Sequence, residues 1–425
     1  MRRRSLLASA SAAALLLGAT ACGVKAETST NSSAQASASA LSGEITFQSW
    51  SLKGDKFSPY FEKLVKDFES SHPGTKINWI DQPGEGYEQK VLQQANSSSL
   101  PDVVNLPPEF AYQLAKAQRL LDLKSVDPKL EETYVTGGLK AYSFDGVEGV
   151  YGYPWYLGTD MNYFNTKALA QAGVAEPKSW DEMVAAAKTM ATKTNGRMPL
   201  ISTMPALQDF SSAGAPIMKD GKFAFNSPEA TAVLQQYVEL YQAKAMPAEV
   251  LKDNYLGNSA LYKQGKVGWA TGTASMITDL KKEAPGLVPD TKVTARFGTP
   301  PLFVQGISVA KESKSPQLAL AFAQHVVDNT NQVEFVKLAQ GFMPGTKEAT
   351  ANPEQFTGAI DDKLMVEAVK IAASQMDKAE MPQPPQFSND MKTYLGQQMA
   401  LALRGDITAQ QALDKSVDYC NKKLA

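Results

Sequence analysis

Apolar and polar residues alternate along some segments of the chain and recur at helical spacing along others. The alternating run 44–50 (EITFQSW) predicts a strand, because alternate residues of a strand face the same side. Residues 57–68 place their apolar side chains every three or four positions and lead to His72-Pro73-Gly74, which predicts a helix that stops there. The same order returns further on, with strands predicted at 75–80 and 102–106 and helices at 87–95 and 109–118.

Later helices are indicated by the residues that start them. Four such starts are present: the capping boxes Ser179-Trp-Asp-Glu182 and Thr408-Ala-Gln-Gln411, and the cap-proline pairs Ser227-Pro228 and Ser315-Pro316. Further strands are predicted at 266–271 and 307–310. Strands that alternate with helices indicate an α/β fold, in which mostly parallel sheets are covered by helices.

The first 21 residues have the pattern of an export signal. Arg2, Arg3 and Arg4 precede the apolar run 6–17, which is too short to span a bilayer of roughly 30 Å as a helix. Small residues follow and lead directly to Cys22. This pattern resembles a bacterial lipoprotein signal, in which residues 1–21 are removed and Cys22 is acylated. An ordinary secretory signal cleaved near Ala21 is the alternative.

Residues 22–42 consist mostly of Ser, Ala and Thr, and they lack the apolar side chains that a folded core requires. We therefore expect a flexible tether behind a lipid anchor. The protein would be held at the cell membrane and face the extracellular or periplasmic side. The second cysteine, Cys420, lies in a helical setting and is interpreted as a buried, inert thiol.

Composition excludes several classes of function. The chain has 42 Lys and Arg against 44 Asp and Glu, and this balance argues against nucleic-acid binding. With two His and two Cys in the whole chain, neither a His/Cys zinc cluster nor a disulfide-stapled scaffold is expected. Neither the dinucleotide-binding fingerprint nor the P-loop motif occurs, so no cofactor and no metal are expected.

Catalytic motifs are also missing. No G-x-S-x-G occurs. Ser308-Val-Ala-Lys311 matches S-x-x-K, but it lies in a predicted strand, which sends positions three apart to opposite faces. The sequence therefore indicates that the protein is not an enzyme.

Aromatic residues are concentrated between Tyr142 and Phe164. Aromatic faces suit the C–H faces of sugar rings, and nearby acids or amides suit sugar hydroxyls. Trp155, which follows a proline in a predicted loop, and Trp50, which ends the first strand, are candidates for such stacking. Tyr163 and Phe164 are interpreted as core residues, and Trp180, inside a capping box, as structural.

Several segments together resemble family 1 extracellular solute-binding proteins, the sugar receptors of ATP-binding-cassette (ABC) importers. The segments that carry the resemblance are Gly152-Tyr-Pro154, Asp160-Met-Asn-Tyr-Phe-Asn165, Gly173, Pro177-Lys-Ser-Trp-Asp-Glu182, Leu100-Pro-Asp-Val-Val104, Gly265-Lys-Val-Gly268, Gly306 and Gly405-Asp-Ile-Thr-Ala-Gln-Gln-Ala412. Their order and spacing cover nearly all of residues 43–425.

This resemblance implies a periplasmic-binding-protein-like fold with two lobes, each built on a mostly parallel sheet, and a hinge of three crossings. Lobe 1 would contain residues 43–156 and 301–340, and lobe 2 residues 157–300 and 341–425. The crossings would lie near 157–158, 299–301 and 341–344. The ligand would bind between the lobes, which close on it.

The resemblance also assigns ligand-facing positions. They are Trp50, Ser51, Asn105, Glu109, Trp155, Tyr156, Gly158, Asp160, Thr273, Gln305, Phe342 and Gln386. Gly158 and Ala274 replace an acid and a tryptophan of maltose-binding members, which argues against maltodextrin as the ligand. Trp155 and Asp160 are expected to dominate the affinity; the alternatives are that Trp155 fills a lobe core and that Asp160 orients a hinge strand.

The expected function is capture of a mono- or oligosaccharide for an ABC importer. The expected partners are the sugar, the transmembrane permease subunits and, through the lipid anchor, the membrane; the protein itself would be a monomer. A receptor for a polyol or a sugar phosphate is the alternative among binding proteins. The competing class is an extracellular carbohydrate-active enzyme such as a glycosidase.

Overall fold

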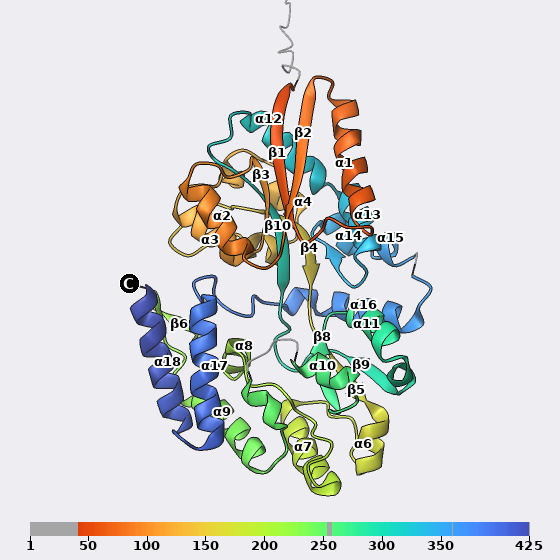
Figure 1. Ribbon diagram of the computed structural model, residues 1–425, viewed down its shortest axis with the longest axis vertical. Coiled ribbons are helices and arrows are strands. Elements are labelled where there is room, and N and C mark those ends of the chain that lie inside the picture. The colour runs from red at the N-terminus through yellow and green to blue at the C-terminus, as the bar shows by residue number, and fades with distance from the viewer. Residues whose placement is uncertain (1–40, 253–256, 359, 425) are drawn as a thin grey trace, which may run out of the picture. The chain divides into compact units, whose positions relative to one another are not determined.

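The structure is a computed structural model that describes residues 41–252, 257–358 and 360–424. Residues 1–40, and with them Cys22, the predicted signal and most of the predicted tether, lie outside the described residues. From Leu41 onward the chain forms one compact unit that contains two lobes, each with its own sheet (Figure 1).

Lobe 1 is built on a six-stranded sheet. In spatial order its strands are β11 (Met343–Pro344), β4 (Tyr153–Gly158), β10 (Phe303–Val309), β3 (Val103–Leu106), β1 (Gly43–Trp50) and β2 (Thr75–Gln82). β1 is parallel to both β2 and β3, as βαβ connections require. β10, in contrast, is antiparallel to β3 and β4, and β11 is antiparallel to β4.

Helices cover both faces of this sheet, and Figure 1 shows α2 and α3 on the side opposite α1. The helices of lobe 1 are α1 (Ser58–Ser71), α2 (Tyr87–Asn96), α3 (Pro108–Lys116), α4 (Leu130–Thr133), α5 (Thr136–Ala141), α12 (Pro316–Val326), α13 (Asn329–Leu338), α14 (Lys347–Ala351) and α15 (Glu354–Thr357), with the 3-10 helix η1 (Leu123–Ser125). The apolar stripe predicted in 57–68 is confirmed, because Phe61, Leu64 and Phe68 of α1 are buried against the sheet.

Lobe 2 has a smaller sheet in the order β8 (Trp269–Gly272), β5 (Met161–Asn165), β9 (Thr291–Thr294). Its other elements are α6 (Thr166–Ala172), α7 (Trp180–Thr194), α8 (Leu207–Ser212), α9 (Pro228–Gln242), α10 (Gly257–Lys263), α11 (Met276–Glu283), α16 (Lys363–Gln375), α17 (Asn389–Arg404), α18 (Ala409–Leu424), the 3-10 helices η2 (Ala248–Leu251), η3 (Pro285–Asp290) and η4 (Met376–Lys378), and the hairpin strands β6 (Met218–Lys219) and β7 (Lys222–Phe223). Both pairings of β5 are antiparallel.

The prediction of mostly parallel sheets is therefore wrong in detail, although the two-lobed α/β fold is confirmed. The reason lies in the path of the chain. β4 carries the chain out of lobe 1 and β10 carries it back, so the two strands run in opposite directions where they pair. In lobe 2 the strands on either side of β5 run opposite to it, and antiparallel neighbours need no helical crossover.

The third crossing also differs from the expected one at 341–344. β11 pairs with β4, and α14 and α15 pack on α13 of lobe 1, whereas α16 packs on β5 and β9 of lobe 2. The chain thus enters lobe 2 between α15 and α16. Residues 341–344 only approach the other lobe: a Cβ on Gly341, whose φ is +100°, would lie 2.3 Å from the backbone nitrogen of Ser275.

Helix starts predicted from the sequence are present in the structure. Thr408 Oγ1 accepts a hydrogen bond from Gln411 N (3.1 Å), and Gln411 Oε1 accepts one from Thr408 N (3.0 Å), which completes a capping box. Ser179 Oγ caps Glu182 N (3.2 Å), but the Glu182 carboxylate accepts from Lys178 N instead of Ser179 N.

Cys420 lies in α18 and is fully buried, as predicted. Burial raises the pKa of its thiol to about 12, so the thiolate is not formed at neutral pH. Among the described residues, no helix has the length and apolar character needed to cross a bilayer.

Candidate functional site

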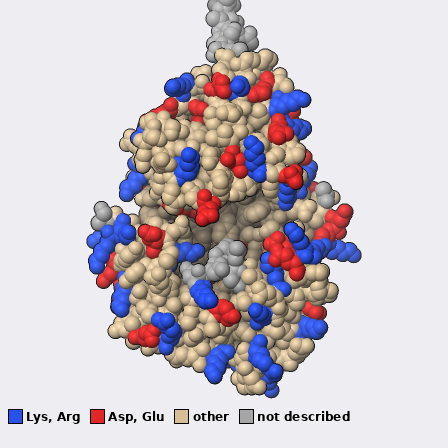
Figure 2. All heavy atoms as spheres, in the orientation of Figure 1, with Lys and Arg blue, Asp and Glu red and all other residues tan. Residues whose placement is uncertain are grey.

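A cavity of about 670 Å³ lies between the lobes, and Figure 2 shows the molecular surface hollowed there. Lobe 1 contributes residues 107–109 at the start of α3. Residues 301–305, at the start of β10 and just before it, also line the cavity. Most of the wall belongs to lobe 2 and comes from the loop 202–206, α8, the segment 296–299 and parts of α7, α9 and α17.

Glu109 reaches the cavity from lobe 1. Pro107 and Pro108 end the extended segment after β3 and start α3, which places Glu109 in the first turn of the helix. Burial raises the pKa of the Glu109 carboxyl, a hydrogen bond from its own backbone N–H opposes this, and nearby Glu88 adds to the increase. Glu109 is thus an acidic group of lobe 1 that faces the ligand space.

Asp160 reaches the cavity from the short connection between β4 and β5. Its side chain is 7% exposed, and its Oδ1 atom has no hydrogen-bond partner in the protein. Burial raises the pKa of Asp160 to about 6, and the positive charge of Arg296 opposes that increase. Asp160 is therefore a buried acid at the cavity wall whose hydrogen bonding is incomplete within the protein.

Arg296, just after β9, lines the same cavity. Its guanidinium lies 5.8 Å from the centre of the Trp269 ring, and its Nη1 donates to Asn162 Oδ1 (3.4 Å). Its Nε is buried without a hydrogen-bond partner. The sequence analysis did not identify Arg296 as a site residue. The signal that could have indicated it was the pair Arg296-Phe297, which lies directly before the expected crossing at 299–301.

Asp209 adds a second lobe 2 carboxylate to the wall. It stands at the start of α8, where its Oδ2 accepts from Ala206 N (2.7 Å). Burial raises the pKa of Asp209, and Arg296 again opposes the shift. The guanidinium therefore stabilises the ionised forms of two carboxylates at once.

Aromatic side chains of lobe 2 complete the wall. Those that line the cavity are Trp180, Tyr237, Trp269, Phe297 and Phe387. Trp180 stacks on Tyr237 with 5.4 Å between ring centres and donates its Nε1 to Gln236 Oε1 (3.1 Å). Trp180 is thus held structurally, as predicted, and also faces the ligand space, which the sequence did not indicate.

Three of the twelve predicted positions line the cavity: Glu109, Asp160 and Gln305. Asn105 lies fully buried behind them. Its Nδ2 donates to Gln305 Oε1 (3.2 Å) and to Gly306 O (3.0 Å), so Asn105 orients Gln305 and does not face the ligand space in this structure.

Four other predicted positions pack together where the crossing strand leaves lobe 1. The rings of Tyr156 and Phe342 lie 5.1 Å apart, and a Cβ on Gly158 would lie 3.2 Å from the Phe342 ring and 3.7 Å from Thr273. None of the four lines the cavity. The space that an acidic side chain at 158 would need is occupied by Phe342.

Trp50 and Ser51 lie at the end of β1, outside the cavity wall. Trp50 stacks on Tyr87 with 5.0 Å between ring centres, and its face is thereby partly covered. Gln386 is half-buried beside Phe387, and only the latter lines the cavity.

Trp155 requires a correction. It lies within β4 and not in a loop, it is fully buried, and its ring centre is 4.4 Å from that of Phe335 and 6.0 Å from that of Phe61. The β4–β10 register shifts between Gln305, opposite Tyr156, and Gly306, opposite Pro154, so Trp155 has no opposite residue. A β-bulge of this kind re-aims a side chain, and here the ring lies in the core of lobe 1.

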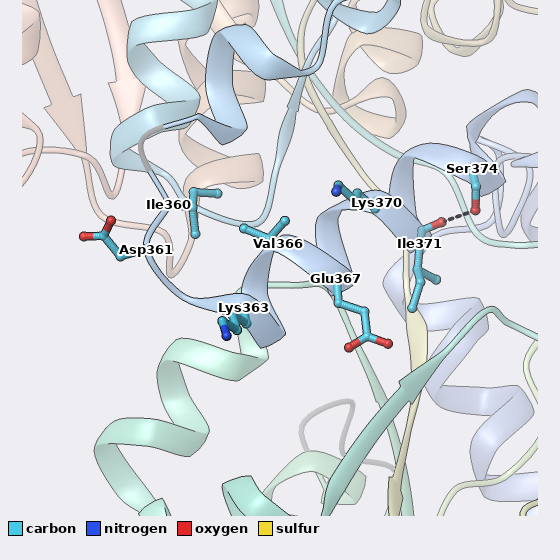
Figure 3. A pocket seen from close by; sticks show the side chains of 8 residues that line it. All are labelled: Ile360, Asp361, Lys363, Val366, Glu367, Lys370, Ile371 and Ser374. Atoms are coloured by element: carbon cyan, nitrogen blue, oxygen red, sulfur yellow. Dashed lines mark hydrogen bonds between the residues drawn. The ribbon is translucent and has the colours of Figure 1, made fainter.

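A second hollow, of about 570 Å³, lies along α16 (Figure 3). It is lined by Ile360, Asp361, Lys363, Val366, Glu367, Lys370, Ile371 and Ser374. All of these come from one helix and the loop before it, so a ligand there would be contacted from one side only. Among the described residues, no cluster of three or more His, Cys, Asp or Glu could hold a metal ion.

The architecture is that of a two-lobed periplasmic-binding-protein-like fold. Residues 63–364 match the model of the bacterial extracellular solute-binding protein family, and the chain belongs to this family. YcjN of Escherichia coli K12, assigned as a periplasmic-binding protein of an ABC transporter, is 23% identical over 66% of this chain and 67% of its own length.

Two further relatives carry names that refer to sugars. An arabinooligosaccharide-binding protein of Halalkalibacterium halodurans is 24% identical over 45% of this chain and 44% of its own length. The crystal structure of a periplasmic-binding protein of Synechococcus sp. MITs9220, assigned to oligosaccharides, matches with a TM-score of 0.79 and 25% identity. That match covers 89% of this chain and 98% of the other.

The buried position of Trp155 predicts a large loss of stability on truncation. Trp155→Ala should lower the free energy of unfolding by about 3–5 kcal/mol, because it leaves a cavity among Phe61 and Phe335. Urea unfolding of the ligand-free protein measures this. Trp180→Ala, at the cavity wall, serves as the comparison and should cost less. A Trp155→Ala protein that unfolds like the wild type would restore the stacking role.

The raised pKa of Asp160 predicts a pH-dependent stability. The folded protein holds this proton up to about pH 6, whereas an ordinary Asp releases it near 3.8, so the folded state binds more protons in between. The free energy of unfolding should therefore fall as the pH rises from 4 to 7. Asp160→Asn should remove about 2–3 kcal/mol of this fall, since one pKa unit corresponds to about 1.4 kcal/mol.

Melting of the ligand-free proteins between pH 4 and 8 checks this prediction. Asp145→Asn, a change at an exposed aspartate of lobe 1, is the control and should leave the profile of the wild type unchanged. Parallel profiles for wild type and Asp160→Asn would show that Asp160 is solvated.

Proposed function

We propose that this chain is the substrate-binding component of an ABC importer and binds a mono- or oligosaccharide between its lobes. The observation that carries the proposal is the composition of the cavity wall. The partly exposed rings of Trp180 and Phe297 line the same cavity as Asp160, Arg296 and Glu109, which are buried or half-buried polar residues. Sugars need both features, because their rings have apolar C–H faces and their edges carry hydroxyl groups.

The distribution of the wall over both lobes supports a receptor that closes on its ligand. A ligand favours the closed state only if it contacts both lobes in that state. Glu109 belongs to lobe 1, and Asp160 and Arg296 belong to lobe 2. The lobes also meet through Asn389 Nδ2 of α17, which donates to Glu88 Oε2 of α2 (3.4 Å).

The alternatives remain a polyol or sugar-phosphate receptor and a carbohydrate-active enzyme. The charges at the cavity argue against a phosphate, since the wall carries three carboxylates (Glu109, Asp160 and Asp209) for its three cationic groups (Lys252, Arg296 and Lys392) and so offers no excess of positive charge. The family and the relatives named above consist of binding proteins, which argues against an enzyme.

Sugar binding predicts a rise in melting temperature and compaction of the protein. At 100 times its dissociation constant, a ligand that binds only the folded state adds about 2.7 kcal/mol of stability. A thermal-shift panel of mono- and oligosaccharides, polyols and sugar phosphates identifies the class. Small-angle scattering with the best ligand should show a smaller radius of gyration. Chromatography of the incubated sugars distinguishes a receptor from an enzyme, which would release products.

We also propose that Cys22 carries the lipid that holds the protein at the outer face of the cell membrane, next to the permease subunits of the importer. The support is the signal-like segment, the small residues before Cys22 and the Ser/Ala-rich tether. The protein would act there as a monomer and would require no cofactor.

Replacement of Cys22 tests the anchor. Cys22→Ser should release the protein from the membrane fraction into the medium or periplasm, because no helix of the described residues could replace the lipid by crossing the bilayer. Cys420→Ser, which changes the only other cysteine, should leave it on the membrane. Membrane retention of the Cys22→Ser protein would contradict the assignment.

A further inference from the structure

Asp160 and Arg296 are placed opposite each other by the end of a β-ladder. β5 and β9 pair antiparallel, with Asn162 opposite Thr294. Two residues beyond that pair, in the same register, Asp160 stands opposite Arg296. The strand pairing that forms the lobe 2 sheet thus brings a carboxylate and a guanidinium to one point of the cavity wall.

The amide of Gln375 fixes this pair of positions. Gln375 is the last residue of α16, and its side chain is 4% exposed. Its Nε2 donates to Asp160 O (3.3 Å), and its Oε1 accepts from Arg296 N (2.7 Å). The Gln375 side chain therefore replaces the hydrogen bonds that would continue the β5–β9 ladder. It holds the backbones of Asp160 and Arg296, so their side chains reach the cavity wall from fixed positions.

The far end of Arg296 is also held. Its Nη1 donates to Asn162 Oδ1 (3.4 Å), and the same oxygen accepts from Trp269 Nε1 (3.1 Å). The guanidinium lies 5.8 Å from the centre of the Trp269 ring. These contacts leave two buried atoms of the pair without a protein partner: Arg296 Nε, which donates, and Asp160 Oδ1, which accepts.

The charges around the pair define the chemistry that it fits. Asp160 and Asp209 both lie in the field of Arg296, although none of the ion pairs within 4 Å among the described residues involves the guanidinium. A ligand carboxylate at this point would add a third negative charge near the guanidinium, which already faces two carboxylates, and the other cations of the wall, Lys252 and Lys392, are matched by only one further acid, Glu109. An uncharged hydroxyl pair fits better, because one hydroxyl can accept from the guanidinium while its neighbour donates to the carboxylate.

We propose, on the basis of the proposed function, that Asp160 and Arg296 act together as the specificity-determining pair of the cavity and bind two adjacent hydroxyls of an uncharged sugar ring. Arg296 donates through its guanidinium and Asp160 accepts through its carboxylate. Gln375 is the positioning residue that holds the pair. The site therefore selects neutral saccharides over uronic-acid saccharides of the same length.

Titration calorimetry with defined sugars tests this assignment. The probes are maltotriose, cellotriose, xylotriose and arabinotriose as neutral saccharides and trigalacturonate as the acidic one. The wild type should bind at least one neutral probe and should bind trigalacturonate at least tenfold more weakly. Arg296→Gln and Asp160→Asn should each weaken the neutral probe by roughly ten- to a hundredfold.

A double-mutant cycle distinguishes a working pair from two independent contacts. The Asp160→Asn/Arg296→Gln protein should lose less affinity than the product of the two single losses, because both residues bind one ring. Arg296→Lys keeps the charge but lacks the planar Nε–H group, and it should still lose affinity. Arg197→Gln, at an exposed arginine of the same lobe, is the matched control and should bind like the wild type.

Each contrary outcome has a definite meaning. Equal binding of the neutral probe by the wild type and by both Arg296 variants would overturn the role of Arg296 and leave the proposed function intact. Tighter binding of trigalacturonate than of the neutral probes would overturn the selection for uncharged rings. Failure of the wild type to bind any of the five probes or any sugar of the thermal-shift panel would overturn the proposed function and this assignment with it.

Discussion

The antiparallel pairing of β4 and β10 is the interaction on which the rest of the structure depends. β4 leads out of lobe 1 and β10 leads back into it. The hydrogen bonds between these two strands therefore hold two of the connections between the lobes together. Gln305 of β10 lines the cavity, and Asp160 follows β4 by two residues. The ligand space therefore lies at the end of this strand pair, where the chain changes lobes and where a change in lobe orientation alters the cavity most directly.

The cavity wall carries charges that a structure selected for stability alone would not bury. Asp160 and Asp209 both have raised pKa values because burial removes water from their carboxylates, and Arg296 compensates for only part of that loss. Uncompensated polar atoms of this kind persist where a ligand completes their hydrogen bonding. The polar wall of lobe 2 is thus a source of instability in the free protein and, under the proposed function, of affinity in the complex.

Periodic features of the sequence predicted much of the fold. The strands and helices of residues 44–118 lie within two residues of the expected bounds, because each has a clear period and a stop signal such as His72-Pro73-Gly74. The two-lobed fold was predicted from the order and spacing of the segments that resemble solute-binding proteins. The direction of β10 and the lobe of β11, α14 and α15 could not be predicted, since these depend on pairing between segments far apart in the sequence.

The candidate site was predicted less well than the fold, for reasons that particular residues make clear. Glu109 and Asp160 were found because the resemblance to solute-binding proteins assigns ligand-facing positions to the segments that follow β3 and β4. Trp155 was misplaced because the β-bulge that directs it into the core has no local signature. Arg296 was missed because its place in the wall depends on its position opposite Asp160 across the β5–β9 ladder, which only the register of two strands more than 120 residues apart reveals.

The position of Gln375 links the site to the hinge. It ends α16, the first element after the third crossing, and its amide holds the backbones of Asp160 and Arg296. Asp160 itself lies just beyond the first crossing, and Arg296 lies shortly before the second. The proposed ligand-binding pair is therefore linked to all three connections between the lobes. Under the proposed function, a ligand that binds this pair would act directly on the segments about which the lobes rotate.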